Sequence, residues 1–289
     1  MWRETRKEEM VRIAGEDGPV LVYDGETLND IVFDLLCLDC VDRLLFDLGL
    51  SSCPELLKAL GRLGAGFQYR SPEDAAAVRG ICRGDEGLAV YLIQDYAQAG
   101  GKASAHYGMI PAIPLSGMTG GDSEGLRDRD VLLVLHRPVS SGKDPGVASC
   151  LREMDRLHAR VRGLYLSWER GPAFYETKQE LLDWQTIAGR DGILVPARGM
   201  GIVLERETGV LDLDSTARNL EELKSIFPDG AVWVEPGAEF LALATALVVP
   251  ADGQARVLGP DNLLLDDFEE DSLKEECYLR ARRICQVPL

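Results

Sequence analysis

Polar residues that could do chemistry stand where short apolar runs of the sequence end. The run Val131–His136 ends on an imidazole, and the run Ala231–Glu235 ends on a carboxylate. An imidazole and a carboxylate that face each other can act as a general acid/base pair. Any ring of strand ends with mixed polar residues offers such a pair, so catalytic roles for His136 and Glu235 are hypotheses.

Other candidates for chemistry have ordinary structural explanations. His106 and His158 fall in predicted loop or helix positions. The sequence holds no metal-ligand spacing, no GxSxG elbow and no phosphate-binding P-loop. Cys37 and Cys40 form a CxxC pair, but no second pair with zinc spacing follows. We therefore expect buried thiols at both positions rather than a metal or redox site.

The strand ends belong to a regular series of short, nearly continuous apolar runs. Helical patterning fills most of the gaps, best seen in Pro145–Val161, Ala173–Ala188 and Ser215–Phe227. This alternation predicts an α/β fold, a closed (β/α)8 TIM-type barrel with its chemistry at the carboxyl ends of the strands. The eight runs are Leu44–Leu50, Ala65–Tyr69, Leu88–Ile93, Met109–Leu115, Val131–His136, Arg162–Trp168, Ile193–Ala197 and Ala231–Glu235.

The ends of the chain depart from this alternation. We expect an N-terminal extension over residues 1–17, the barrel over 18–240, and a vestigial β-hairpin with an acidic tail over 241–289. Pro19–Tyr23 reads as a strand before a helix that runs to about Leu38. The apolar stretch Phe240–Val249 is expected to pair with Ala255–Leu258 across a turn at Asp252-Gly253.

Composition excludes several classes of partner. The chain has 289 residues, 46% of them hydrophobic, and a formal net charge of −17. Such a charge repels phosphates, so we expect neither a nucleic-acid partner nor an anionic membrane surface. Seven cysteines, an odd number, argue against a disulfide scaffold. There is no signal-peptide pattern and no apolar run of about 18 residues, so a cytoplasmic protein is expected.

Six segments together resemble one family, the pyridoxal-phosphate (PLP) decarboxylases of diaminopimelate, ornithine and arginine, which share the alanine-racemase-like barrel. They are VLVYDGETL, GAGFQYRSPEDAAAV, SGKDPG, RGLYLSWERG, ARGMGI and VEPGAEF, in the family's order over residues 18–260. The resemblance implies a PLP-binding barrel. PLP in such enzymes needs a lysine for its Schiff base. The family's lysine position matches Gly49, and no lysine lies within six residues on either side.

Most other cofactor positions differ as well. Gln68 replaces an acidic residue, Ser167 replaces the ring-stacking histidine, and Ala238 replaces the phosphate-binding arginine. Directly after Gly259-Pro260 the chain has Asp261-Asn262-Leu263, without the family's cysteine. Arg198, Gly199 and Gly201 match the family's phosphate cradle, where they form either an anion site or a plain turn. Trp168 either stacks on a flat ligand or packs at the barrel mouth. Glu235 matches the carboxylate that pairs with the pyridinium nitrogen, or is satisfied by hydrogen bonds within the mouth.

These losses favour a pseudoenzyme that works by binding or regulation. We expect no cofactor, with PLP possible only as a non-covalent ligand. The implied partners are a second copy of the chain or an active paralogue, together with a small anionic or amino-acid-derived ligand. The alternative is an active carbon–carbon lyase on an amino-acid-derived substrate, with PLP bound non-covalently or absent.

Overall fold

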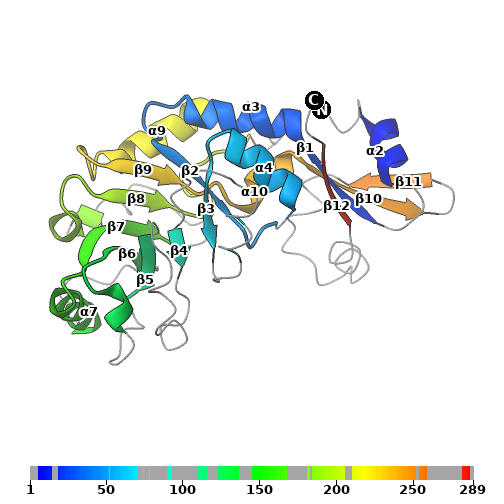
Figure 1. Cartoon of the computed structure of the whole chain (residues 1–289). Helices are drawn as coiled ribbons and strands as arrows, with labels where there is room; N and C mark the ends of the chain where they lie inside the picture. The colour runs from blue at the N-terminus through cyan, green and yellow to red at the C-terminus, as the bar shows by residue number, and fades with distance from the viewer. Residues whose placement is uncertain are drawn as a thin grey trace.

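The computed structural model describes a barrel and a smaller sheet beside it (Figure 1). The description covers residues 6–14, 19–51, 53–69, 74, 78, 90–92, 110–115, 123–136, 145–167, 181–182, 184–205, 210–251, 254–258 and 282–286.

Eight parallel strands follow one another around the barrel in chain order. The ring closes where the first and last strands pair, through Arg43↔Trp233 and Leu44↔Val234. Each strand lies within, or within two residues of, one of the eight predicted apolar runs, so the expected α/β fold with a parallel sheet is confirmed. The strands are β2 (Arg43–Asp47), β3 (Gly66–Tyr69), β4 (Val90–Leu92), β5 (Ile110–Pro114), β6 (Asp130–Leu135), β7 (Arg160–Leu166), β8 (Ile193–Pro196) and β9 (Ala231–Val234).

Side chains alternate between the inside of the barrel and the helices outside it. Inward residues form one cluster that includes Leu45, Leu132 and Tyr165, whereas Phe46 and Leu133 belong to the cluster under the helices. A strand buried on both faces needs apolar residues at consecutive positions, which explains the unbroken runs in the sequence. Among the described residues, the buried polar side chains inside the barrel lie near the carboxyl ends of the strands.

Helices connect several of these strands and pack on the outside of the barrel. Asp24 begins α3 and Asp212 begins α9 by accepting the N–H groups of Thr27 and Ser215. Pro54 begins α4, where its missing N–H costs no hydrogen bond. A complete set of eight barrel helices stays a prediction. The helices are α2 (Lys7–Ala14), α3 (Gly25–Leu36), α4 (Pro54–Arg62), α7 (Pro145–Arg156), α9 (Leu213–Lys224) and α10 (Gly237–Leu243), with a short 3-10 turn at Ser123–Leu126.

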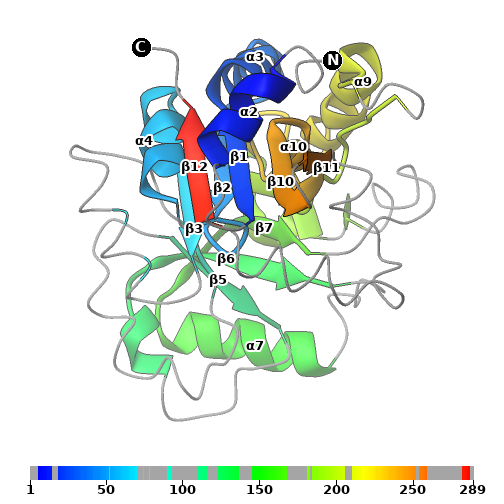
Figure 2. The ribbon, with the colours of Figure 1, turned by 90° about the vertical axis from the view of Figure 1, so that its right-hand side faces the viewer.

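A second sheet takes strands from both ends of the chain (Figure 2). Its order is β11 (Gln254–Leu258), β10 (Thr245–Ala251), β1 (Val20–Asp24) and β12 (Arg282–Gln286). β1 runs antiparallel to β10 and parallel to β12, and α2 packs on the sheet through the fully buried Met10. The β10–β11 hairpin agrees with the sequence prediction.

Two expectations about this region need correction. The start of the apolar stretch Phe240–Val249 is helical, because Gly237–Leu243 forms α10 before β10 begins. The strand β1 belongs to the second sheet, although the expected barrel range 18–240 includes it. The domain boundaries themselves stay a prediction.

The two sheets share one hydrophobic core. Leu21 and Tyr23 of β1 and Leu247 of β10 belong to the same buried cluster as the outward residues of the barrel strands. The Tyr23 hydroxyl also donates a buried hydrogen bond to Ser51 Oγ, at 2.8 Å, just after β2. In the described part of the chain, no helix is long and apolar enough to cross a membrane.

Candidate functional site

Glu235 lies directly after β9 at the carboxyl end of the barrel, with 1% of its surface exposed. One carboxylate oxygen accepts the backbone N–H of Arg198, and the other accepts that of Gly237 at 2.8 Å. Its pKa is raised to about 7, because burial and, to a smaller extent, the Asp47 carboxylate raise it by more than the two backbone donors and the Arg198 charge lower it. Glu235 is therefore a carboxyl that exchanges its proton near neutral pH.

Two tight loops hold this carboxylate. Gly199 and Gly237 have left-handed φ angles of 73° and 78°. A Cβ on Gly237 would lie 2.8 Å from the carbonyl carbon of Arg198, so only glycine allows the loops after β8 and β9 to approach this closely. The Gly199 N–H in turn donates to the Glu235 carbonyl at 2.9 Å. The two loops thus hold the carboxylate through backbone N–H groups.

Tyr165 and Gln68 join opposite walls of the barrel beneath the strand ends. The Tyr165 hydroxyl, from β7, donates to Gln68 Oε1 on β3 at 3.0 Å. These strands are four places apart in a ring of eight, so the bond spans the interior. Burial, and then the Glu235 charge, raise the pKa of Tyr165, which keeps its hydroxyl a donor. The hydrogen bond closes the barrel below its mouth.

Asp47 completes this group. It pairs with Gln68 across β2 and β3, is 6% exposed, and accepts the Gly49 N–H at 2.8 Å. We call Asp47, Gln68, Tyr165 and Glu235 the mouth layer. All four side chains are buried, and two of them are carboxylic acids.

The predicted acid/base pair has separate hydrogen-bond partners. His136 follows β6 with its Nδ1 3.1 Å from the Ser167 carbonyl oxygen, and its side chain is exposed. The hydrogen bonds among the described residues join it to Ser167 and join Glu235 to two backbone N–H groups. The acid/base role of His136 and Glu235 stays a prediction.

The predicted cradle after β8 is a tight turn. Its Gly199 and Met200 N–H groups donate to the carbonyls of Glu235 and Ala197. Gly201, with φ 85°, accepts a hydrogen bond from the Asn219 side chain at 3.2 Å. Arg198 is exposed, has a left-handed φ of 56°, and its charge lowers the pKa of Glu235. An anion here would meet a guanidinium rather than a row of available amides.

Some expectations concern residues outside the described part. Trp168 is one of them, so neither ring stacking nor packing can be assigned to it. The described lysines lie away from the mouth layer. Lys7 is on α2, Lys58 is on the exposed face of α4, and Lys224 ends α9, where its Nζ lies 3.0 Å from Asp42. Gly49, at the family's lysine position, lies in the turn after β2.

Sequence reasoning missed the role of Tyr165 and the partners of Asp47 and Asp24. Alternation along β7 was the available signal, since Tyr165 lies two residues before Ser167 and so shares its inward face. The partners of Asp47 became clear only from strand register. Asp24 has a structural role, since it caps α3 and pairs with Arg6 at 2.6 Å.

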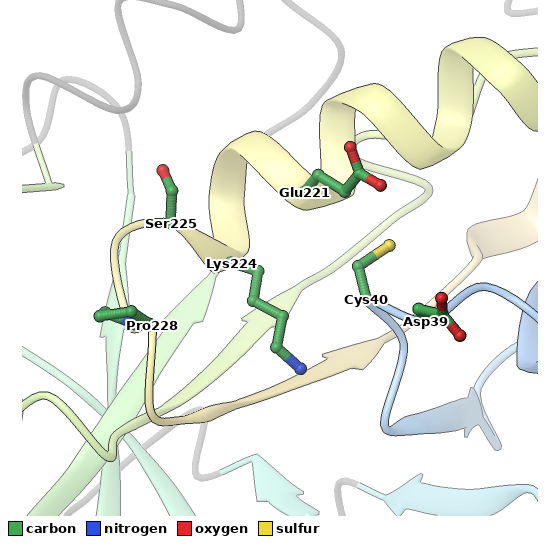
Figure 3. Close-up of a pocket in the computed structure, with 6 residues that line it drawn as sticks. All are labelled: Asp39, Cys40, Glu221, Lys224, Ser225 and Pro228. Carbon is green, nitrogen blue, oxygen red and sulfur yellow. The ribbon is translucent and has the colours of Figure 1, made fainter.

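A hollow of about 250 Å³ lies at the other end of the barrel (Figure 3). It is lined by Glu221, Lys224 and Ser225 at the end of α9, by Asp39 and Cys40 of the loop before β2, and by Pro228. Cys40 is buried as predicted, but Cys37 is exposed, because the helix ends there and turns its side chain outward. Among the described residues no group of side chains could hold a metal ion.

Comparison with known proteins supplies the fold. No family model and no curated protein matches the chain. Solved structures do match. Lysine decarboxylase from Selenomonas ruminantium is 16% identical with a TM-score of 0.67, over 87% of this chain and 72% of that one. Paramecium bursaria Chlorella virus arginine decarboxylase bound to agmatine is 15% identical with a TM-score of 0.64, over 88% and 75%.

Ornithine decarboxylase from Entamoeba histolytica is also similar, at 15% identity and a TM-score of 0.63, over 89% of this chain and 76% of that one. The chain has the fold of these decarboxylases. The family resemblance inferred from the sequence is thereby confirmed at the level of fold. Identities this low show the fold alone, so the activity of the chain has to be argued from its own residues.

The expectation of no cofactor is contradicted by a further match. The structure of SrLDC in complex with PLP and cadaverine is 15% identical with a TM-score of 0.60, over 87% of this chain and 70% of that one. A barrel of this kind thus holds PLP. The expectation gave too much weight to the missing lysine, which removes a covalent bond but not the buried carboxylate.

The residues present fit PLP in part. Glu235 is a buried carboxyl with a pKa raised to about 7, so a cationic ring nitrogen would stabilise its charged form. Arg198 supplies a positive charge beside it for a phosphate. Gly49 offers no amine for a covalent link. The fit is therefore to non-covalent binding.

Proposed function

We propose that this chain is a decarboxylase-like barrel that binds PLP, or a close relative of it, non-covalently and works as a regulatory pseudoenzyme. The main support for the proposal is the combination of Glu235 and Gly49 at the carboxyl end of the barrel. The mouth layer keeps the buried carboxylate Glu235 at the end of β9, while the end of β2 presents Gly49 where the family has its lysine. The anchor for the ring is retained and the covalent attachment is lost.

Each residue has a definite task in this proposal. Glu235, held in place by the N–H groups of Arg198 and Gly237, would accept a hydrogen bond from the protonated ring nitrogen. The Arg198 guanidinium would supply the positive charge for the phosphate. Tyr165 and Gln68 close the barrel beneath the ligand and exclude water from below. PLP, when bound, supplies an electron-withdrawing ring, but no described lysine is placed to turn that property into catalysis.

Spectroscopy with borohydride tests the proposal. PLP added to the purified protein should raise its melting temperature and show the absorbance of the free aldehyde, and borohydride should leave no PLP attached to the protein. Gly49→Lys should retain PLP covalently after borohydride. Gly49 is not among the described glycines with left-handed φ, so its backbone accepts a side chain. Arg43→Lys, at the opposite end of β2, is the matched control.

Three results would overturn the proposal. They are no binding of PLP, covalent retention of PLP by the unmodified protein, or decarboxylation of lysine, ornithine or arginine that depends on PLP. The last result would establish the active lyase.

Regulation requires a partner, and we propose a second copy of this chain or an active paralogue with the same fold. The chain keeps the fold of the decarboxylases, so pairing with a protein of the same fold is the form of regulation that we propose. Size-exclusion chromatography with light scattering, alone and mixed with decarboxylase paralogues, tests this point. A strictly monomeric protein that forms no mixed species would contradict the regulatory part and leave ligand binding to be judged separately.

A further inference from the structure

Four neighbouring strands end in a row of inward-facing residues at the mouth of the barrel. Val134 of β6, Tyr165 of β7 and Val195 of β8 pair in register and lie in the inward cluster. Trp233 of β9 lies in the same cluster. Side chains alternate along a strand, so the residues two positions further on also face inward. We call these residues the rim row, which consists of His136, Ser167, Ala197 and Glu235.

The rim row is continuous and has small side chains at its centre. The N–H groups of Ser167, Ala197 and Glu235 each donate to a carbonyl oxygen at the end of the neighbouring strand. A carboxyl group stands at one end of the row and an imidazole at the other. Adjacent strands lie about 4.8 Å apart, so these ends are about 14 Å apart along the wall. A flat ring held by Glu235 can therefore extend over Ala197 and Ser167 toward His136.

The hydrogen bond of His136 determines which of its ring nitrogens can meet a ligand. Its Nδ1 lies 3.1 Å from the Ser167 carbonyl oxygen, which can only accept, so Nδ1 carries a proton. In the part of the chain that the structure describes, no residue forms a hydrogen bond with Nε2, and the side chain is exposed. Nε2 accepts from a hydroxyl group when it is unprotonated and donates to an ionised oxygen when it is protonated. In both states its natural partner is an oxygen atom of the ligand.

We infer that His136 binds an oxygen on the ligand ring through Nε2, at the edge of the ring away from the nitrogen that Glu235 holds. In PLP this oxygen is the 3-hydroxyl group. The inference rests on the proposed function and deepens it. The two ends of the rim row together make the site specific for a hydroxylated pyridine, with Glu235 recognising the nitrogen and His136 the oxygen.

Calorimetric titration with PLP and with 3-deoxypyridoxal 5′-phosphate, which lacks only the ring oxygen, tests the inference. The unmodified protein should bind PLP more tightly. His136→Ala should weaken the binding of PLP about tenfold, as expected for one lost hydrogen bond, and leave that of the deoxy compound unchanged. His136→Phe keeps a flat ring without nitrogens and should behave in the same way.

His158→Asn is the matched control. It removes an exposed imidazole from the turn before β7, at the opposite end of the barrel, where asparagine tolerates the left-handed φ of 54°. Both affinities should stay as they are in the unmodified protein.

The outcomes separate this inference from the proposed function. If PLP does not bind at all, the proposed function fails and the inference fails with it. If PLP binds but the His136 variants bind it as tightly as the unmodified protein does, or lose affinity for both compounds equally, the inference alone is overturned. Equal binding of the two compounds by the unmodified protein overturns it even if neither His136 variant folds.

Discussion

Glu235 is a buried carboxyl whose charge is only partly compensated by the protein. Burial outweighs its two backbone donors and raises its pKa from 4.5 to about 7. A carboxyl with a raised folded-state pKa stabilises the fold while it is protonated. Glu235 should therefore make the protein less stable as pH rises from about 4.5 to about 7.

Glu235→Gln should remove that pH dependence. At about 1.4 kcal/mol per pKa unit, the unmodified protein should lose about 2–3 kcal/mol of unfolding free energy across this window relative to the variant. Urea titrations at several pH values give the unfolding free energy of each protein, and its slope against pH is compared between the two. Glu221→Gln, at an exposed position, should behave like the unmodified protein. Parallel slopes for Glu235→Gln and the unmodified protein would show that the Glu235 pKa is not raised.

The bond between Tyr165 and Gln68 couples two strands that never touch through their backbones. Tyr165→Phe removes the donor and leaves Gln68 Oε1 buried without it, which should cost about 1–3 kcal/mol. The double variant Tyr165→Phe/Gln68→Leu removes both polar groups and should recover part of that loss. Denaturant unfolding of the two single variants and the double variant gives the coupling energy. Strictly additive losses would contradict a direct hydrogen bond.

Strand β7 depends on a glycine where it meets β8. The pairing of β6 with β7 shifts by one residue between Val131 and Leu132, which leaves Arg162 of β7 as a bulge. On its other side β7 pairs with β8, and there Gly163 lies opposite Ile193. A Cβ on Gly163 would lie 1.8 Å from the Ile193 carbonyl oxygen. Gly163→Ala should cost at least about 2–3 kcal/mol by forcing these strands apart, whereas Arg162→Ala, at a half-buried position with screened ion pairs, should change stability by about 0.5 kcal/mol or less. Thermal unfolding of the two variants measures these losses of stability. Equal losses in Gly163→Ala and Arg162→Ala would contradict a specific clash at Gly163.

The sequence predicts the elements well because their signals are local. Apolar runs located the eight strands, and capping residues such as Asp24 and Asp212 stand where α3 and α9 begin. Long-range pairing was harder, because nothing local in Val20–Asp24 places β1 between β10 and β12. The helix at Gly237–Leu243 was missed since its seven residues are apolar almost throughout and offer no periodic contrast.

The candidate site was predictable only in part for the same reason. Glu235 could be predicted because it directly follows an apolar run and lies in the segment VEPGAEF, which resembles the family. Tyr165 lies within a strand that is apolar on both sides of it, and its role depends on which strand is opposite. The state of Glu235 depends on two backbone donors from different loops, which no spacing in the sequence encodes.

At the scale of the whole molecule, the barrel and the second sheet form one packing unit. β1 is paired on both sides, leads directly into α3, and shares its buried cluster with the barrel helices. A sheet held in this way does not gain or lose structure independently of the barrel. Unfolding should therefore be a single transition, even though the chain forms two sheets.

Leu247→Ala tests whether the second sheet and the barrel unfold together. Leu247 is 1% exposed, pairs with Leu21, and packs in the cluster that includes the barrel helices. Its truncation should cost about 2–5 kcal/mol and lower the melting temperature of the whole chain without splitting the transition. Scanning calorimetry and circular dichroism at two wavelengths should give coincident curves. A second transition, with the barrel melting at its original temperature, would show that the sheet is a separate unit and that the mouth layer does not depend on it.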